Sequence, residues 1–458
     1  MRVKRSLFLS FLLLAALLVP AQSNLSGNVR NLGIKRVYLM SLYGEKAPVI
    51  DSTSSDSAGL FRFILAPQRQ PGMYRVQWSK EGLVDFIWNH EDVVFSTTMN
   101  NPEDSLVFPG SAENRINLEY SRRDRINQSK LELLIPIVDY YPVKDRYYVS
   151  TAQEMEKIQK NQLQYLDSLV KFYPGYFAVR MAKVYRTPYL PSTLSKEERV
   201  NFLKQHYFDK VDFTDTALLH SMVFANKAIS YLALYSNNHL PQKQLQAEFI
   251  KAVTIILSAA SVNSEVYKFL LDYLVGGFDK YHFDDVIEFI ADNFQDPFSC
   301  EDQQRKTALQ KKLDTFKKIA IGKIAPELEI PDSKGKIVKL SALQSEFTLL
   351  VFWSAQCPHC TDMLPKLKAI YDKQKPKRFE VITVSLDTSK ASWTSFLKTE
   401  KLNWINLADL KGFAGKPADD YNIYATPTMF LLDREKKILA KPISMRELEQ
   451  VLSDQKLR

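Results

Sequence analysis

The spacing of apolar and polar residues changes twice along the chain and predicts three structural regions. Residues 24–110 contain short runs of β-branched and aromatic residues between turn formers, a pattern typical of an all-β sandwich, or a small barrel, with antiparallel strands. In residues 111–318 apolar residues recur at helical spacing, which predicts an all-α bundle of about six to eight helices. In residues 319–458 strand and helix patterns alternate, which predicts an α/β domain with a mixed central sheet.

A few segments define the first two regions. Four apolar runs predict β-strands in the first region, at residues 37–40, 60–64, 74–78 and 92–95. In the second region Leu218, Ala225 and Ile229 fall with other apolar residues on one face, so we expect one amphipathic helix there. Neither pattern indicates what these regions bind.

The third region contains the strongest strand signal. Thr348–Trp353 is a continuous apolar run, as expected for a strand that is buried on both faces. Further strands are predicted at residues 379–386, 428–432 and 438–440, and helices at 361–373, 390–400 and 444–454.

The first 23 residues have the pattern of a secretory signal peptide. Basic residues precede an apolar stretch, Leu7–Val19, which ends in small residues suited to cleavage. The stretch is shorter than the roughly 20 residues needed to span a bilayer, so we favour removal of this segment over an uncleaved anchor helix. No later segment is apolar enough to cross a membrane. We therefore expect a periplasmic protein with no membrane span in the mature chain.

Composition and charge narrow the classes of function. Hydrophobic residues make up 45% and charged residues 25% of the chain, which is ordinary for a globular protein. The net charge of +9 is spread along the sequence, and its one dense basic run, residues 373–378, has no interleaved aromatic residues. Nucleic-acid binding normally needs a concentrated basic face, so we expect none.

The chain has only three cysteines, Cys300, Cys357 and Cys360. These are too few for the disulfide framework of a small exported scaffold. Cys300 has no partner nearby in the sequence and is expected to be a free thiol, with a regulatory or intermolecular bond as the alternative. The other two form a CxxC motif, Cys357-Pro-His-Cys360.

The motif stands where a strand gives way to a helix. It follows the strand predicted at 348–353 and opens the next helix. A helix N-terminus presents free N–H groups and a partial positive charge, which favour the thiolate that acts as nucleophile. Pro358 suits the first helical turn because its missing N–H is no loss there, and His359 adds a positive or hydrogen-bonding group. We expect Cys357 to attack a disulfide and Cys360 to resolve the mixed disulfide.

Other uses of a CxxC pair fit less well. A disulfide across two residues closes too small a loop to stabilise much by chain entropy. A zinc site needs about four ligands, and a c-type haem needs His directly after the second cysteine, where this chain has Thr361. We therefore expect no metal and no small-molecule cofactor.

Several further motifs surround the CxxC pair. They are Gly322–Pro326, Asp332–Lys336 with Leu340-Ser341, Phe352–Ser354, Pro365 and Ala425–Phe430. On these motifs, residues 319–458 resemble the thioredoxin-like family of exported disulfide reductases, in the branch related to cytochrome c maturation proteins. Segments at 49–52, 59–63 and 208–213 are similar to accessory domains of unknown function that precede such domains in exported proteins of Gram-negative bacteria.

The resemblance implies roles for residues around the motif. In that family a cis-proline loop lies against the active-site sulfurs and offers backbone groups to an extended substrate. Thr426 is therefore expected to bind substrate, and Pro427 to belong with Cys357, Cys360 and His359 among the catalytic residues. Trp353 and Pro358 are expected to contribute to substrate binding. The alternative for Pro427 is a trans proline that opens a strand.

Two positions depart from the family pattern. Gln356 stands where many members have an aromatic residue, and Met363 stands where many cytochrome-maturation reductases have a buried acid. The Pro-His dipeptide resembles that of strongly oxidising periplasmic catalysts, and it should lower the thiolate pKa and raise the reduction potential. The direction of electron flow therefore stays open, with the reductase direction favoured.

These patterns predict an exported thiol–disulfide oxidoreductase that exchanges disulfides with protein disulfide or dithiol substrates and with an unidentified redox partner. One alternative is a peroxiredoxin-like thiol peroxidase. Ser354 fits the peroxidase pattern, but Leu350 occupies the position of its proline. The other alternative is a binding protein that uses a redox-inactive thioredoxin-like scaffold.

Overall fold

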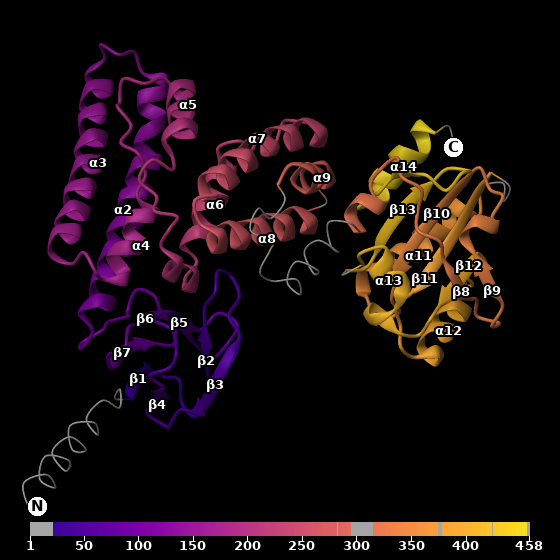
Figure 1. Ribbon diagram of the computed structural model, residues 1–458, viewed down its shortest axis with the longest axis horizontal. Helices are drawn as coiled ribbons and strands as arrows, with labels where there is room; N and C mark the ends of the chain where they lie inside the picture. Colours follow the sequence, from indigo (N-terminus) through magenta and orange to yellow (C-terminus); the bar gives the residue numbers. More distant parts are fainter. Residues whose placement is uncertain (1–21, 282, 295–314, 374–377, 424, 456–458) are drawn as a thin grey trace, which may run out of the picture. The chain divides into compact units, whose positions relative to one another are not determined.

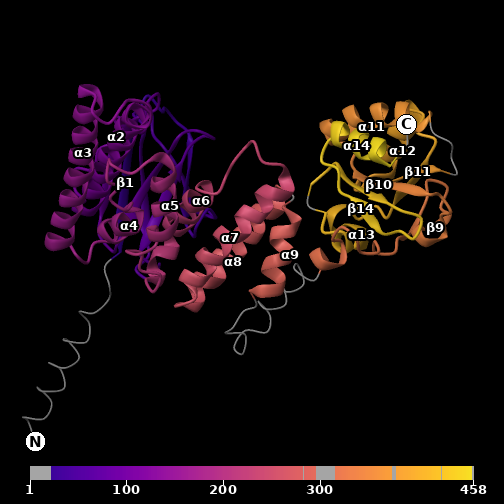
Figure 2. The same ribbon diagram turned by 90° about the horizontal axis from the view of Figure 1, so that it is seen from above.

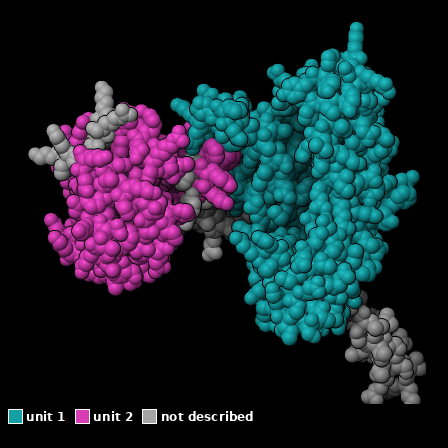
Figure 3. All heavy atoms as spheres, turned by 180° about the vertical axis from the view of Figure 1, so that it is seen from behind, with its two compact units in different colours: residues 1–274 teal, residues 275–458 magenta. Residues whose placement is uncertain are grey.

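The computed structural model describes residues 22–281, 283–294, 315–373, 378–423 and 425–455. The chain divides into two compact units, residues 1–274 and 275–458 (Figure 3). Residues 1–21 of the expected signal peptide and Cys300 lie outside the described residues, and the limits expected for the three regions stay predictions. Among the described residues, the helices are too short or too polar to span a bilayer.

Seven strands form the β-rich part in the described residues. β1 (Ser23–Arg30) lies between β4 (Leu60–Leu65) and β7 (Val93–Thr98) in one sheet, and the second sheet has the order β3–β2–β5–β6. The buried faces of the two sheets share one core, which confirms the predicted sandwich. The pairing of β1 with β7 is parallel, however, and not antiparallel as expected. The remaining strands are β2 (Arg36–Ser41), β3 (Val49–Ser54), β5 (Gly72–Gln77) and β6 (Leu83–Trp88).

Helices follow from Ala112 to Asn293, as predicted. The two longest described helices, α2 and α3, lie side by side (Figure 1, Figure 2). Ser111 is the N-cap residue of α2, and its Oγ accepts the N–H of Asn114. The α-helices of this stretch are α2 (Ala112–Tyr140), α3 (Arg146–Phe172), α4 (Phe177–Tyr185), α5 (Lys196–His206), α6 (Val223–Ala233), α7 (Gln242–Ala260), α8 (Ser264–Lys280) and α9 (Asp284–Asn293).

One predicted helix is in fact two elements. Leu218 belongs to the 3-10 helix η1 (Thr216–His220), whereas Ala225 and Ile229 belong to α6. Ser221 separates the two, because its backbone is extended and its hydroxyl donates to the carbonyl of Leu218. Ile229 is 48% exposed. The expectation that it shares one buried helix face with Leu218 and Ala225 is therefore wrong.

A five-stranded sheet forms the centre of the C-terminal part, in the order β12–β11–β10–β13–β14. β10 (Phe347–Trp353) lies in the middle, parallel to β11 (Phe379–Ser385) and antiparallel to β13 (Thr428–Leu432). All residues of β10 are buried, which confirms the prediction of a strand covered on both faces. The other strands described here are β8 (Glu329–Pro331), β9 (Ile337–Lys339), β12 (Ile405–Ala408) and β14 (Ile438–Ala440).

Helices cover both faces of this sheet (Figure 2). Leu349 and Val351 point into a core that includes side chains of α11, α12 and α14, whereas Leu350 points into a second core with side chains of α13. This alternation follows from the two-residue period of a strand. The bounds of these helices are α11 (Pro358–Tyr371), α12 (Lys390–Thr399), α13 (Lys416–Asp420) and α14 (Met445–Asp454).

The sheet topology brings three loops to one edge. β10 and β11 are parallel and end at the same edge, and the antiparallel β13 begins there. The loops after Trp353 and after Ser385 therefore meet the loop before Thr428. The CxxC motif and the predicted proline loop lie at this edge.

Candidate active site

Cys357 is the N-cap residue of α11. Its backbone is extended, with φ −90° and ψ 111°, and its Sγ accepts a hydrogen bond from the Cys360 N–H at 3.3 Å. At this position helices normally carry Ser, Thr, Asp or Asn, whose side-chain oxygen accepts from an otherwise unpaired N–H. A sulfur at this position accepts hydrogen bonds from the same N–H groups and lies in the partial positive charge of the helix terminus. Pro358 occupies the first helical position, where no N–H is needed.

The two sulfurs lie in different surroundings. Cys360 is fully buried, whereas Cys357 is half-buried. Burial, together with a hydrogen bond to Cys357, raises the pKa of the Cys360 thiol to about 12. Partial burial acts to raise the pKa of Cys357, but hydrogen bonds from Cys360, the Thr426 side chain and nearby backbone N–H groups outweigh it and lower that pKa below its ordinary value. The geometry therefore favours a thiolate on Cys357 and a thiol on Cys360.

The loop at Thr426 and Pro427 lies against Cys357. The peptide bond between Thr426 and Pro427 is cis, as the family resemblance implies. The carbonyl oxygen of Thr426 is 3.3 Å from Cys357 Sγ and accepts a hydrogen bond from the protonated thiol. Thr426 and Pro427 are both half-buried. Each of these two residues therefore has an exposed part beside the Cys357 sulfur, and a partner protein has access to it there.

The other expected site residues are either exposed beside Cys357 or buried in the core. Pro358 and His359 are exposed beside Cys357, and His359 reaches Cys357 through its backbone N–H. Trp353, which was expected to bind substrate, is fully buried, and its ring lies 5.1 Å from that of Phe396. In this conformation Trp353 presents no surface to a substrate, and its contacts are those of a core residue.

One residue near the site was not singled out from the sequence. Asp387 follows β11, and it is only 3% exposed. Its carboxylate accepts hydrogen bonds from Ser354 Oγ at 2.7 Å, from Ala355 N–H at 3.0 and 3.1 Å, and from Ser385 Oγ at 2.7 Å. The sequence did contain a signal for Asp387. This residue comes directly after the strand predicted at 379–386, and parallel strands end at the same edge of a sheet, where the CxxC motif also lies.

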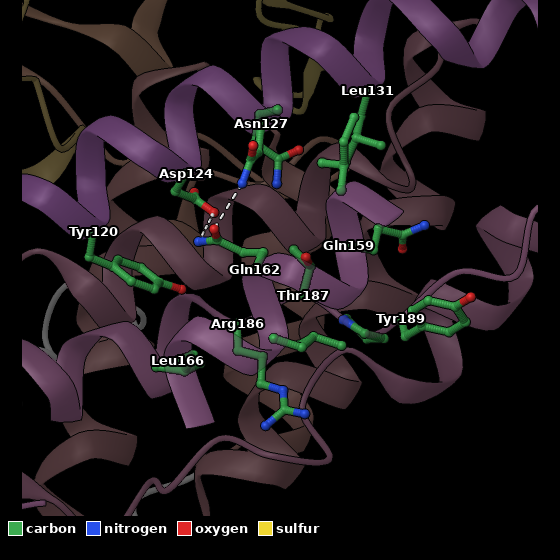
Figure 4. Close-up of a pocket in the computed structure, with 14 residues that line it drawn as sticks. Tyr120, Asp124, Asn127, Leu131, Gln159, Gln162, Leu166, Arg186, Thr187 and Tyr189 are labelled. Atoms are coloured by element: carbon green, nitrogen blue, oxygen red, sulfur yellow. Dashed lines mark hydrogen bonds between the residues drawn. The ribbon is translucent and has the colours of Figure 1, made fainter. Parts of the chain in front are cut away.

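A separate cavity lies in the helical region, between α2, α3 and the residues after α4 (Figure 4). Its volume of ≈ 40 Å³ admits about three water molecules. Gln162 donates to Asp124 at 3.3 Å and accepts from Asn127 at 2.8 Å. No cysteine lines this cavity, so we assign it no part in thiol chemistry. Across the described part of the chain, no group of three or more His, Cys, Asp or Glu side chains could hold a metal ion.

Fold and site together define the class of protein. A cysteine pair at the start of a helix, beside a cis-proline loop at the edge of a mixed sheet, is the arrangement of a thioredoxin-like thiol–disulfide oxidoreductase. Residues 321–441 match the model of the AhpC/TSA family. Residues 149–293 match a domain of unknown function, DUF5106.

Individual relatives make the assignment more specific. The thiol-disulfide oxidoreductase ResA of a Bacillus cereus strain is 31% identical over 134 residues, which are 29% of this chain and 76% of the relative. The chain therefore belongs to the family of thiol–disulfide oxidoreductases that includes ResA. The sporulation thiol-disulfide oxidoreductase A of Bacillus subtilis (strain 168) is 32% identical over 107 residues, which are 23% of this chain and 63% of the relative.

Solved structures include similar chains. A thiol-disulfide oxidoreductase from Bacteroides fragilis NCTC 9343 is 31% identical, with 29% of this chain and 99% of that chain covered and a TM-score of 0.27. A thioredoxin-like protein from Bacteroides caccae ATCC 43185 is 24% identical, with 59% of this chain and 98% of that chain covered and a TM-score of 0.43.

Proposed function

We propose that this enzyme is an exported, periplasmic thiol–disulfide oxidoreductase that exchanges disulfides with protein partners through Cys357 and Cys360. The observation that supports this most is the position of the Cys357 sulfur at a helix N-cap, where its pKa is lowered, next to a buried thiol whose pKa is raised. The basic residues and the apolar stretch before residue 20 support export.

In the reductase direction, which we favour, the two sulfurs act in sequence. The Cys357 thiolate attacks one sulfur of the partner's disulfide, forms a mixed disulfide and releases the other partner sulfur as a thiolate. Cys360 then gives up its proton and attacks Cys357 Sγ. This step forms the Cys357–Cys360 disulfide and releases the second partner sulfur.

The exchange balances over both steps. The partner's disulfide takes up two electrons and two protons, and the enzyme's dithiol becomes a disulfide. One proton comes from Cys360, and the other reaches the partner through solvent from the ionisation of Cys357. The dithiol of a second redox partner returns the enzyme to its reduced form by the same chemistry in reverse.

The residues around the sulfurs have matching roles in this proposal. Thr426 and Pro427 form the surface beside Cys357 on which an extended segment of the partner binds, and the exposed ring of Pro358 borders it. The backbone N–H of His359 helps to stabilise the Cys357 thiolate. Trp353 supports the start of α11 from the core.

Serine in place of Cys360 should trap the partner proteins. The variant keeps the attacking sulfur but lacks the resolving one, so the mixed disulfide should accumulate. Expressed with its own leader in a Cys300→Ser background, Cys360→Ser should give adducts on non-reducing gels that dithiothreitol removes. Mass spectrometry then identifies the captured proteins.

The matched control for trapping changes Cys357 as well. In the same background, the double variant Cys357→Ser, Cys360→Ser should give no adducts. Absence of adducts with Cys360→Ser would count against the proposed function, as would adducts from the single variant that are not joined through Cys357.

A further inference from the structure

Asp387 is a buried acid for which the exchange steps above have no use. No ion pair in the described part of the chain includes it, and its hydrogen-bond donors are two hydroxyl groups and one backbone N–H. A carboxylate removed from water is costly unless hydrogen-bond donors replace the water. Here four hydrogen bonds from Ser354, Ala355 and Ser385 do so.

Two of the three donor residues lie in the loop that leads to Cys357. Ser354 donates through its hydroxyl and Ala355 through its N–H. The Ser354 hydroxyl also accepts the N–H of Gln356 at 3.1 Å, and the Ser354 carbonyl accepts the N–H of Cys357 at 3.1 Å. Asp387 therefore fixes each residue from Ser354 to Cys357, either directly or through Ser354.

The geometry points to Asp387 as a positioning residue for Cys357. Its carboxylate ties the loop of residues 354–356 to the end of β11, and thereby holds Cys357 Sγ where it meets the Cys360 N–H and the Thr426 carbonyl. This inference rests on the proposed function, because it concerns the sulfur that attacks the partner. A carboxylate that only stabilised the fold would affect unfolding and leave the reactivity of Cys357 unchanged.

Two hydroxyl donors to Asp387 provide a matched pair of variants. Ser354 and Ser385 each donate to the carboxylate at 2.7 Å, but only Ser354 belongs to the loop before Cys357. Ser354→Ala therefore removes a contact that holds the loop, whereas Ser385→Ala removes an equivalent contact on the β11 side. Asp387→Asn weakens the contacts with the loop and with β11 at once, since an amide nitrogen replaces one accepting oxygen.

The measurement is the rate at which the reduced protein reacts with 5,5′-dithiobis(2-nitrobenzoate), as a function of pH, in a Cys300→Ser background. Asp387→Asn and Ser354→Ala should react roughly 10-fold more slowly at neutral pH, because misplacement of a reacting group by about 1 Å can cost 10- to 100-fold. The midpoint of the pH profile of Ser354→Ala, which keeps the Asp387 carboxylate, should move upward, because Sγ is displaced from donors that favour the thiolate. Ser354→Thr, which keeps the hydroxyl, should restore the rate.

Thermal unfolding of each variant separates reactivity from stability. Ser354→Ala and Ser385→Ala should both unfold at a lower temperature than the Cys300→Ser parent, because each loses a hydrogen bond. Ser385→Ala should nevertheless react within about twofold of the parent rate, since the contacts of Asp387 with the loop remain. An unchanged rate in Asp387→Asn, or equal losses in Ser354→Ala and Ser385→Ala, would overturn the inference. If the protein with Asp387 intact fails to react at a pH where thiols ionise, the proposed function fails and the inference falls with it.

Discussion

Serine in place of Cys357 should remove disulfide exchange almost completely. A serine hydroxyl does not ionise at neutral pH and cannot replace a thiolate in attack on a disulfide. Cys360 cannot take over, because it is fully buried and its pKa is raised to about 12. We expect insulin reduction, with dithiothreitol as the electron source, to fall at least about 1000-fold, as when a nucleophile is removed from other enzymes.

The control for this prediction is Cys300→Ser, which should keep the full rate. Circular dichroism should show that Cys357→Ser still folds, because serine can also accept at an N-cap. Activity that survives in Cys357→Ser would refute the assignment of the nucleophile. Consumption of hydrogen peroxide faster than reduction of insulin would instead favour the thiol peroxidase interpretation.

Alanine in place of Trp353 should strongly destabilise the C-terminal part of the chain. The indole is fully buried in the core between β10 and α11, where it packs against Phe396. Replacing a buried aromatic side chain with alanine costs about 3–5 kcal/mol of unfolding free energy. Hydrogen exchange of peptides from β10 and α11 during a urea titration measures the unfolding free energy of this part of the chain separately from the rest.

Phenylalanine at the same position separates packing from substrate binding. Trp353→Phe keeps much of the ring, and it removes an Nε1 that is buried without a hydrogen-bond partner, so the cost should be only about 1–2 kcal/mol. If Trp353 acts by packing alone, the variant should reduce insulin at close to the normal rate. A lower rate without a matching loss of stability would show that Trp353 contacts the substrate.

Local patterns predicted much of this fold and site. The apolar run at 348–353 identified β10, because a strand covered on both faces needs apolar residues at consecutive positions. The CxxC motif also predicted that a helix begins there, and the family resemblance implied the cis bond between Thr426 and Pro427. These features are encoded within a few residues.

Six of the described strands lie outside the predicted ones, namely β1, β3, β6, β8, β9 and β12. Two of them, β1 and β12, contain residues that usually form turns. β1 includes Gly27, where an added Cβ would lie 2.2 Å from the ring of Phe61, so close packing in the sandwich requires glycine there. β12 is four residues long and includes Asn406. The buried side chain of Asn406 is satisfied there because its amide N–H groups donate hydrogen bonds to the carbonyl oxygens of Leu402 and Trp404. Only the tertiary contacts explain why these segments are strands.

The part of the site that was missed depends on contacts between distant residues. Asp387 and Ser354 are 33 residues apart in the sequence, and no short motif links the two. Trp353 shows the converse case, because its place next to the CxxC motif suggested contact with substrate, whereas the two-residue period of β10 turns its ring into the core.

The central claim is that Cys357 ionises below the ordinary pKa of a thiol while Cys360 stays protonated. Alkylation of the reduced protein with iodoacetamide between pH 5 and 10, with each cysteine quantified by mass spectrometry, tests this most directly, because only thiolates react. We predict that Cys357 is modified first, with a midpoint below that of an ordinary thiol, and that Cys360 stays unmodified throughout. Equal modification of both cysteines, or a Cys357 midpoint at or above that of an ordinary thiol, would contradict it.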